Sequence, residues 1–368
     1  MKNEGIGGRV VTNQKLRYGL IGAGNNALKK HVSNYTALSN IEFVSVCDIN
    51  IDNASKVASE YNIQGVYNDF REMLRREKLD IVSICTPNHL HADIAVYALQ
   101  QGVNVHCEKP LAINEAEAQR IVDAKNNSGK KVLVGLNNRF TNEAVKIKQY
   151  IDEGFFGEIY HAKTGWRRRS GIPGRGTWFT NKDFSGGGVM IDLGVHYLDL
   201  TLFLLGLPEP SYITGSTYQN FTNSTTRNRN GYKGNLTGIY NVEDTAVGLI
   251  GLKSGATLHF DFSWASNIES EETFVEILGT KGGAIYKNGE LKLFSEHLNT
   301  CIDIIPHLNS TIKSKNEFEH FVNCILNNDN LYAPAEDGVY MMKIVDHFYK
   351  AAELQEPVLF ESKSAVII

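Results

Sequence analysis

Short apolar runs alternate with helical patterns over the first third of the chain. The runs have the length of strands, and the segments between them repeat apolar residues every three or four positions. Alternating strands and helices are joined by right-handed crossovers, which produce a parallel sheet covered on both faces. We therefore predict an α/β Rossmann dinucleotide-binding domain at residues 16–138, after a polar arm at residues 1–15. The expected strands are 16–21, 41–47, 81–85, 103–106 and 132–134, and the expected helices are 27–38, 54–61, 70–75, 91–101 and 115–128.

The pattern changes after residue 138. Apolar runs now follow one another through short glycine-containing turns, which is typical of antiparallel hairpins. We predict a second, α+β domain at residues 139–368 with a mostly antiparallel open sheet, and a surface insertion or lid in the polar stretch 220–241. The expected strands are 159–166, 212–218, 246–252, 257–264, 273–279, 284–286 and 291–294, and the expected helices are 142–153, 316–326 and 336–354.

Composition narrows the function classes. The net charge of −4 and the absence of a basic block argue against a nucleic-acid or membrane partner. The five cysteines have no metal-ligand spacing, so we expect reduced thiols, no metal and a cytoplasmic location. No secretion signal or stretch of about 20 apolar residues is evident. The cationic run 167–169 suits a local anion or sugar site and a solvated loop equally well.

A glycine turn follows the first expected strand. Gly22 allows the tight turn and Gly24 the close approach of a pyrophosphate to the helix N-terminus, with Ala27 in place of a third glycine. Asp48, at the end of the next strand, is placed to accept hydrogen bonds from the adenosine ribose and to repel a 2′-phosphate. NAD is therefore favoured over NADP, the alternative for Asp48 being a helix cap. The expected contacts in this turn are Gly22, Gly24, Asn25, Asn26 and Asp48.

The turn Thr86-Pro87-Asn88 lies at the carboxyl end of another expected strand, where ligands bind in open parallel sheets. Thr86 and Asn88 are candidates for the ribose or nicotinamide half of the cofactor, with His91 at the start of the following helix. The alternative is an ordinary strand–helix turn capped by Asn88.

Lys109 follows the fourth long strand, between Glu108 and Pro110. The proline restricts Lys109 to an extended backbone, so its side chain has a defined direction. An ammonium there is suited to holding a substrate hydroxyl and the oxyanion it becomes. The alternative is a surface salt bridge with Glu108.

Asp192 and His196 are four residues apart in an apolar helical pattern, so we expect them on one helix face. Histidine is suited to accept a hydroxyl proton near neutral pH, and a carboxylate partner can orient it. The preceding glycines at 186–188 are expected to allow close backbone approach to a ligand.

These motifs together resemble the Gfo/Idh/MocA family of oxidoreductases over nearly the whole chain, on the Glu-Lys-Pro motif at 108–110 and the glycine run with Asp192 and His196. The resemblance implies that Lys109, Asp192 and His196 line a nicotinamide pocket. Hydride then passes from a sugar or cyclitol to nicotinamide while the histidine takes the hydroxyl proton. It also implies a homo-oligomer, with a tetramer favoured. Further contacts would fall on Glu108 and Asn137 for the cofactor and on Arg139, Trp166 and Arg168 for the substrate.

The segment 167–178 is polar and aromatic and is expected to form part of the substrate wall, with Trp178 at its end. Aromatic faces beside Arg and His suit a hexose, a glycoside or an inositol, and oxidation at C3 of a glucoside is the specific hypothesis. The alternatives are an NAD-dependent glycosidase or other enzyme that retains its cofactor through a closed redox cycle, and a non-catalytic sugar or nucleotide sensor. A zinc-dependent alcohol dehydrogenase is disfavoured because the metal ligands are missing.

Overall fold

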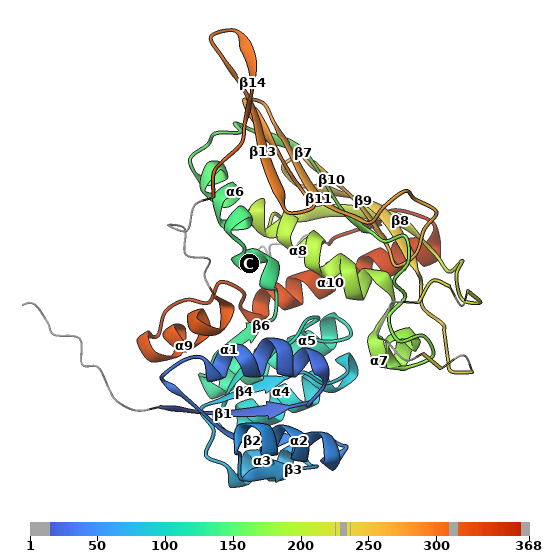
Figure 1. Cartoon of the computed structure of the whole chain (residues 1–368). Coiled ribbons are helices and arrows are strands. Elements are labelled where there is room, and N and C mark those ends of the chain that lie inside the picture. The colour runs from blue at the N-terminus through green and yellow to red at the C-terminus, as the bar shows by residue number, and fades with distance from the viewer. Residues whose placement is uncertain (1–14, 225, 229–233, 236, 309–315, 362–368) are drawn as a thin grey trace, which may run out of the picture.

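The protein contains two β-sheets in separate layers, connected by helices between them (Figure 1). The structure is a computed structural model that describes residues 15–224, 226–228, 234–235, 237–308 and 316–361. The predicted polar arm therefore lies outside the described residues except for Lys15.

The first sheet is parallel and has six strands in the order β3-β2-β1-β4-β5-β6. This order places the carboxyl ends of β1 and β4 side by side, where a dinucleotide binds in this type of sheet. The predicted strands are found, and β3 is an addition too short to show a period. The strands are β1 (Leu16–Ile21), β2 (Ile41–Cys47), β3 (Gly65–Tyr67), β4 (Ile81–Ile84), β5 (Asn104–Cys107) and β6 (Val132–Val134).

Helices follow these strands on both faces of the sheet. The first is interrupted: a π-helical segment, η1, follows the glycine turn and continues into the short helix α1. The helices and helical turns of this part are η1 (Ala27–Val32), α1 (Ser33–Thr36), α2 (Ile51–Tyr61), α3 (Phe70–Arg76), η2 (Asn88–Leu90), α4 (His91–Gln100) and α5 (Glu115–Ser128).

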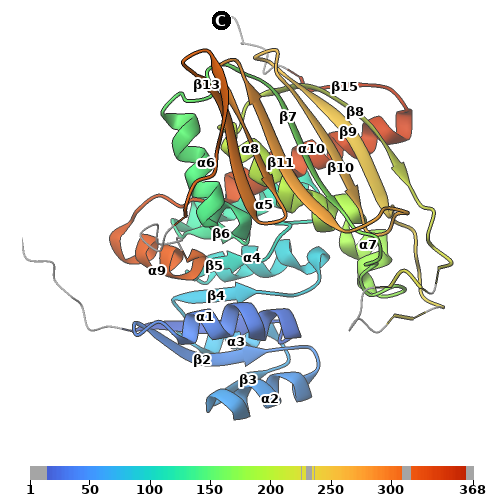
Figure 2. The ribbon, with the colours of Figure 1, turned by 45° about the horizontal axis from the view of Figure 1, so that its top comes forward.

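The second sheet has nine strands in the order β14-β13-β12-β11-β7-β10-β9-β8-β15. Only β7 and β10 pair in parallel, so the predicted α+β domain with a mostly antiparallel sheet is confirmed. Figure 2 shows α8 and α10 along one face of this sheet. The strands are β7 (Ile159–Arg167), β8 (Pro210–Tyr218), β9 (Thr245–Leu252), β10 (Thr257–Ser263), β11 (Glu272–Gly279), β12 (Gly282–Lys287), β13 (Glu290–His297), β14 (Thr300–Ile304) and β15 (Val358–Leu359).

The helices of the second part include two at the end of the chain that also contact the first sheet. Helix α10 packs on both β8 and α5, and the Val134 N–H donates to the Ala333 carbonyl at the edge of β6. Phe318 of α9 packs edge-on against His31 and Tyr35. The remaining elements are η3 (Asn137–Phe140), α6 (Asn142–Asp152), η4 (Trp178–Thr180), α7 (Lys182–Ser185), η5 (Met190–Gly194), α8 (Val195–Leu204), α9 (Glu317–Asn327) and α10 (Ala335–Leu354).

One helical stretch meets the length and composition of a membrane span, although the sequence suggested none. It covers Lys182–Leu204, and 78% of its apolar window is buried inside the protein. This is the behaviour of a core helix, and it is the stretch that carries Asp192 and His196. The five cysteines are free thiols.

Candidate active site

The glycine turn after β1 has the geometry that a bound pyrophosphate requires. Gly22 has φ +91°, and a Cβ there would lie 2.6 Å from the Cys85 carbonyl oxygen. Above Gly24, no atom lies within 4 Å of the position of an added Cβ. Asn25 and Asn26 are exposed at the start of the helix. The turn therefore presents helix N-terminal N–H groups beside open space.

Asp48 is not the helix cap that the sequence left as an alternative, because the Asn50 side chain caps α2 by accepting from the Asp52 N–H at 3.1 Å. Its Oδ2 accepts from the Ala23 N–H at 2.8 Å, and its Oδ1 accepts from the Asn50 N–H at 2.9 Å. A carboxylate has about four lone-pair sites, so each oxygen keeps acceptor capacity for a ribose hydroxyl. The carboxylate thus fixes the glycine turn and remains available beside it.

The turn at 86–88 is more structural than predicted. The Asn88 side chain donates to the Ser185 carbonyl at 2.8 Å and so connects the first sheet to the glycine run. The two ring nitrogens of His91 lie 2.8 Å from the Pro110 carbonyl and 2.9 Å from the Thr86 carbonyl. The predicted cofactor contact of His91 is therefore corrected: its buried ring joins two loops. Burial lowers the pKa of His91.

Lys109 and Asp192 meet across the junction of the two parts. Lys109 Nζ donates to the Asp192 carbonyl oxygen at 2.8 Å and to Asp192 Oδ1 at 3.0 Å. Trp264 Nε1 donates to Asp192 Oδ2 at 2.9 Å. Burial by itself would raise the pKa of Asp192, but Lys109 and Arg168 outweigh it and lower that pKa to about 2. Asp192 is therefore an anion that orients the ammonium, and Trp264 is a site residue that the sequence analysis missed.

His196 lies at the start of α8, directly after the π-helical turn η5 that holds Asp192. Among the described residues no hydrogen bond joins it to Asp192, and its Nδ1 is buried without a hydrogen-bond partner. The expectation that Asp192 orients His196 is thus corrected, because Asp192 binds Lys109 instead. Burial, assisted by the charge of Lys109, lowers the pKa of His196 to about 3. The imidazole is therefore neutral at physiological pH.

The glycine run makes room for protein groups rather than for a ligand, contrary to the prediction. A Cβ on Gly188 would lie 1.9 Å from the Glu243 carbonyl oxygen, and one on Gly187 would lie 2.0 Å from the Tyr349 hydroxyl oxygen. The Glu243 carboxylate accepts from the Gly188 and Met190 N–H groups, both at 3.0 Å, and from the Tyr349 hydroxyl at 2.8 Å. This carboxylate therefore holds the backbone that leads into Asp192.

Glu243 and Tyr349 were missed because nothing in the local sequence connects positions 188, 243 and 349. An acidic residue before a strand has many ordinary roles. Only the folded chain brings the three segments together.

Glu108, which was predicted to contact the cofactor, is buried with its carboxylate bound to protein groups. Its Oε1 accepts from Lys30 Nζ at 3.0 Å and lies 2.9 Å from His31 Nε2, and its Oε2 accepts from the Lys109 N–H at 3.1 Å. Burial would raise the pKa of Glu108, but Lys30 and His31 lower it well below its usual range. Lys30 also pairs with Glu317 of α9 at 3.0 Å. The glutamate therefore fixes the backbone of Lys109 and ties it to η1 and α9.

The predicted substrate contact of Arg139 is also corrected. Its side chain is fully buried, and it pairs with Asp199 and Asp337 and donates to the Tyr332 carbonyl. The guanidinium also stacks on the Phe203 ring at 4.6 Å. These contacts use Arg139 to join η3, α8 and α10, so it is not a substrate contact.

Trp166 and Arg168 lie together beside His196. The Trp166 and His196 ring centroids are 6.0 Å apart, and the Arg168 guanidinium carbon lies 4.5 Å from the centre of the Trp166 ring. Trp178, at the end of the segment 167–178, lies in η4 and stacks on Phe179 with ring centroids 3.9 Å apart. The structure thus brings Trp166 and Arg168 to the histidine, whereas the ring contact described for Trp178 is with Phe179.

The residues at this junction fit a nicotinamide dinucleotide. The Thr86 hydroxyl and the Asn137 amide oxygen are buried without hydrogen-bond partners among the described residues. Buried polar atoms of this kind usually have partners, so both are suited to ligand groups. The open space above Gly24 and the acceptor capacity of Asp48 are further features that suit the cofactor.

Comparison with known proteins identifies the family. Residues 16–136 match the family described as "Oxidoreductase family, NAD-binding Rossmann fold", and residues 144–285 match the "GFO/IDH/MocA C-terminal domain". The chain belongs to the Gfo/Idh/MocA oxidoreductases. Its first domain is an NAD-binding Rossmann domain, as the glycine turn and Asp48 predicted.

The names of several relatives of this Gfo/Idh/MocA protein describe dehydrogenases of sugars and cyclitols. It is 32% identical to "D-glucoside 3-dehydrogenase" of Escherichia coli (strain K12) over 93% of this chain and 97% of that protein. It is 33% identical to "Inositol 2-dehydrogenase" of Salmonella typhimurium over 39% of this chain and 43% of that protein. A structure of "Levoglucosan dehydrogenase, complex with NADH and levoglucosan" superposes with a TM-score of 0.83 at 22% identity, over 95% of this chain and all of that one.

Proposed function

We propose that this protein is an NAD-dependent dehydrogenase that oxidises a secondary ring hydroxyl of a sugar or glycoside, with C3 of a glucoside as the specific position. The observation that carries the proposal is the pairing of Lys109 with Asp192 next to the neutral, half-buried His196. An oriented cation and a neutral base at one point are what the removal of a hydroxyl proton requires.

The chain's own residues have separate tasks in this reaction. Lys109 binds the hydroxyl oxygen and stabilises the negative charge that develops on it, while Asp192 keeps the ammonium in place. His196 accepts the hydroxyl proton, and its low pKa ensures that it is unprotonated beforehand. Bound NAD supplies the hydride acceptor. Thr86 and Asn137 are proposed to hold the cofactor close to this point, and Asp48 its ribose.

Two features support a glucoside as the substrate. The Trp166 ring lies with its centroid 6.0 Å from that of His196, and the Arg168 guanidinium carbon lies 4.5 Å from the Trp166 ring centre. Pyranose rings present apolar C–H faces to aromatic side chains and hydroxyl edges to charged ones. The relative named as a glucoside 3-dehydrogenase covers nearly the whole chain at 32% identity.

The test is a substrate panel with product analysis. The purified protein is mixed with NAD and with methyl glucosides, free hexoses or inositols, and NADH absorbance is followed while the products are separated. Formation of NADH in equal amount with a 3-keto glucoside supports the proposal. Release of aglycone without net NADH would instead show a closed redox cycle, and oxidation restricted to primary alcohols or aldehydes would contradict the proposal.

We further propose a cytoplasmic homo-oligomer, with a tetramer favoured, that pairs through the face of the second sheet opposite α8 and α10. Tyr160 and Phe294 are exposed large side chains on strands of this sheet, 52% and 38% accessible. The five free thiols agree with a reducing compartment. Light scattering of the eluted protein tests the assembly: a mass of four chains is expected, and a monomer would contradict it.

A further inference from the structure

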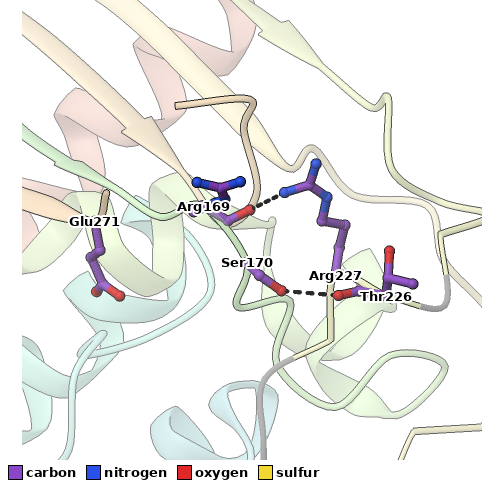
Figure 3. A pocket seen from close by; sticks show the side chains of 5 residues that line it. All are labelled: Arg169, Ser170, Thr226, Arg227 and Glu271. Carbon is purple, nitrogen blue, oxygen red and sulfur yellow. Dashed lines mark hydrogen bonds between the residues drawn. The ribbon is translucent and has the colours of Figure 1, made fainter. Parts of the chain in front are cut away.

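A cavity of about 450 Å³ has a lining that does not include Lys109, Asp192 or His196. Figure 3 shows the side chains that line it. Its volume is in the range of small-molecule sites. All of its lining residues carry polar or charged groups, whereas most ligand pockets are lined mainly by apolar side chains. The lining residues are Arg169, Ser170, Thr226, Arg227 and Glu271.

Three loops build this cavity, and hydrogen bonds hold them together. The Arg227 carbonyl accepts from the N–H groups of Gly171 at 3.0 Å and Ile172 at 2.9 Å. The Arg227 guanidinium donates to the Arg169 carbonyl at 2.5 Å and to Asn267 Oδ1 at 2.6 Å. Thr226 and Arg227 of the polar insertion thus form one wall, against the loops that follow β7 and precede β11.

Glu271 connects this cavity to the catalytic centre. Its Oε1 accepts from Trp166 Nε1 at 2.8 Å and from Arg168 Nε at 3.3 Å. Trp166 in turn lies beside the His196 ring. A sugar ring placed on Trp166 for oxidation therefore has the cavity next to it, on the far side of the Glu271 carboxylate.

We propose that this cavity binds the second unit of the substrate, a hydroxyl-rich aglycone such as another sugar residue, which makes disaccharides the preferred substrates. The inference rests on the proposed function and deepens it. Each sugar hydroxyl both donates and accepts a hydrogen bond. The lining offers both partners: guanidinium donors of Arg169 and Arg227, the Glu271 acceptor, and the hydroxyls of Ser170 and Thr226.

An anionic or an aromatic aglycone fits this lining less well. The Arg169 and Arg227 guanidiniums donate to neutral carbonyl and amide oxygens, but Glu271 shares their cavity and would repel a phosphate or carboxylate. An aromatic aglycone would leave the charged groups without new partners when water is displaced. A neutral sugar meets neither obstacle.

The test compares matched pairs of substrates that differ in the second unit. Maltose is compared with methyl α-glucoside and cellobiose with methyl β-glucoside, by kcat/KM for NADH formation. We expect kcat/KM of at least one disaccharide to exceed that of its methyl glucoside about tenfold, mainly because KM is lower. A tenfold difference is about what one additional hydrogen bond to a charged group contributes. Equal values in both pairs would overturn the proposal, as would a higher value for an aryl glucoside or for a glucoside whose aglycone carries a carboxylate.

Variants assign the effect to the cavity. Arg169→Gln is preferred to a change at Arg227, because the Arg227 guanidinium holds the loops together. Thr226→Val is a second variant, which removes a hydroxyl from the lining instead of a charge. Each variant should reduce the ratio of kcat/KM for the disaccharide to kcat/KM for the methyl glucoside toward one. Arg76→Gln, on the exposed surface of α3, is the matched control and should leave the ratio unchanged. A ratio that survives in both cavity variants overturns the proposal.

A binding measurement separates this proposal from the proposed function. The disaccharides are titrated calorimetrically into the NADH-loaded protein, which needs no turnover. Binding that weakens about tenfold in Arg169→Gln, without oxidation of any glucoside, supports the cavity and refutes the dehydrogenase. Oxidation of glucosides without any disaccharide preference supports the dehydrogenase and refutes the cavity.

Discussion

Lys109 Nζ donates to both the backbone carbonyl and the side-chain carboxylate of Asp192, at 2.8 and 3.0 Å. One residue comes from the first sheet and the other from the helix that packs on the second sheet. The double contact fixes the ammonium in two directions, so its position depends on how the two parts of the protein meet. The catalytic centre is therefore a property of the junction.

Replacement of Lys109 should remove transition-state stabilisation with little effect on cofactor binding. We expect Lys109→Ala to reduce kcat by about 10²–10⁴-fold, since the developing oxyanion loses its cation. NAD affinity, measured by fluorescence titration, should change by less than about threefold because Asp48 and the glycine turn are intact. A variant with near-normal kcat would contradict the assigned role.

Replacement of His196 should remove the proton acceptor. His196→Ala is expected to reduce kcat by about 10²–10⁴-fold, the usual contribution of a general base. His259→Ala is the matched control, because His259 lies exposed on β10 in the same domain. Comparable turnover in the two variants would show that another group accepts the proton.

The low pKa of His196 also predicts a pH effect on stability. The folded protein holds this ring unprotonated down to about pH 3, whereas an unfolded chain takes up the proton near pH 6.5. The unfolded state binds more protons between these values, so stability is complete above pH 6.5 and falls as the pH drops toward 3. From pH 7 to pH 5 this amounts to at most about 2 kcal/mol, an upper bound because the ring is only half-buried.

Thermal unfolding at several pH values measures this effect. Between pH 7 and pH 5, the Tm of His196→Asn should fall less than the Tm of the unchanged protein, because asparagine does not titrate. His259→Ala again serves as the control and should follow the unchanged protein. Parallel curves for all three proteins would rule out a buried neutral His196.

Asp48 should determine the choice between NAD and NADP. Asp48→Asn keeps one acceptor oxygen, for the Ala23 N–H, and removes the charge that repels a 2′-phosphate. Its amide group then lies beside the Asn50 N–H, which is exposed and can bind water instead. We expect the preference of kcat/KM for NAD over NADP to narrow by about tenfold, while Tm changes little. Asp48→Ala should additionally lower Tm, because the glycine turn loses its acceptor. An unchanged cofactor preference in both variants would remove Asp48 from the ribose site.

Glu243 should act on catalysis through position alone. In Glu243→Gln one oxygen becomes an amide donor, which cannot accept from the Gly188 or Met190 N–H. The unpaired N–H should cost about 1–3 kcal/mol of stability and shift the backbone that carries Asp192. We expect kcat of Glu243→Gln to fall while its KM for NAD stays constant. Tyr349→Phe should show a smaller fall in kcat, again without a change in KM for NAD. A loss of Tm without any change in kcat would mean that Glu243 only stabilises the fold.

The regular elements were predictable because their periods are local. The strands at 16–21, 41–47 and 132–134 and the helix at 115–128 begin and end at the predicted residues. The strands β3 and β15 were missed because three and two residues cannot display a period. The five-residue strand β14 was missed as well. The π-helical segments η1 and η5 were also missed, since an inserted residue in a helix leaves the apolar pattern almost unchanged.

The amino-acid sequence by itself determined the chemistry that this protein carries: a glycine turn with Asp48, a lysine at a strand end, and a carboxylate and histidine on one apolar helix. These motifs are local, so spacing and residue type are enough to recognise them. Which groups pair was decided by the tertiary structure alone. Asp192 binds Lys109 instead of His196, and Glu108 is used by Lys30 and His31, because hydrogen bonds depend on distances between segments that only folding brings together.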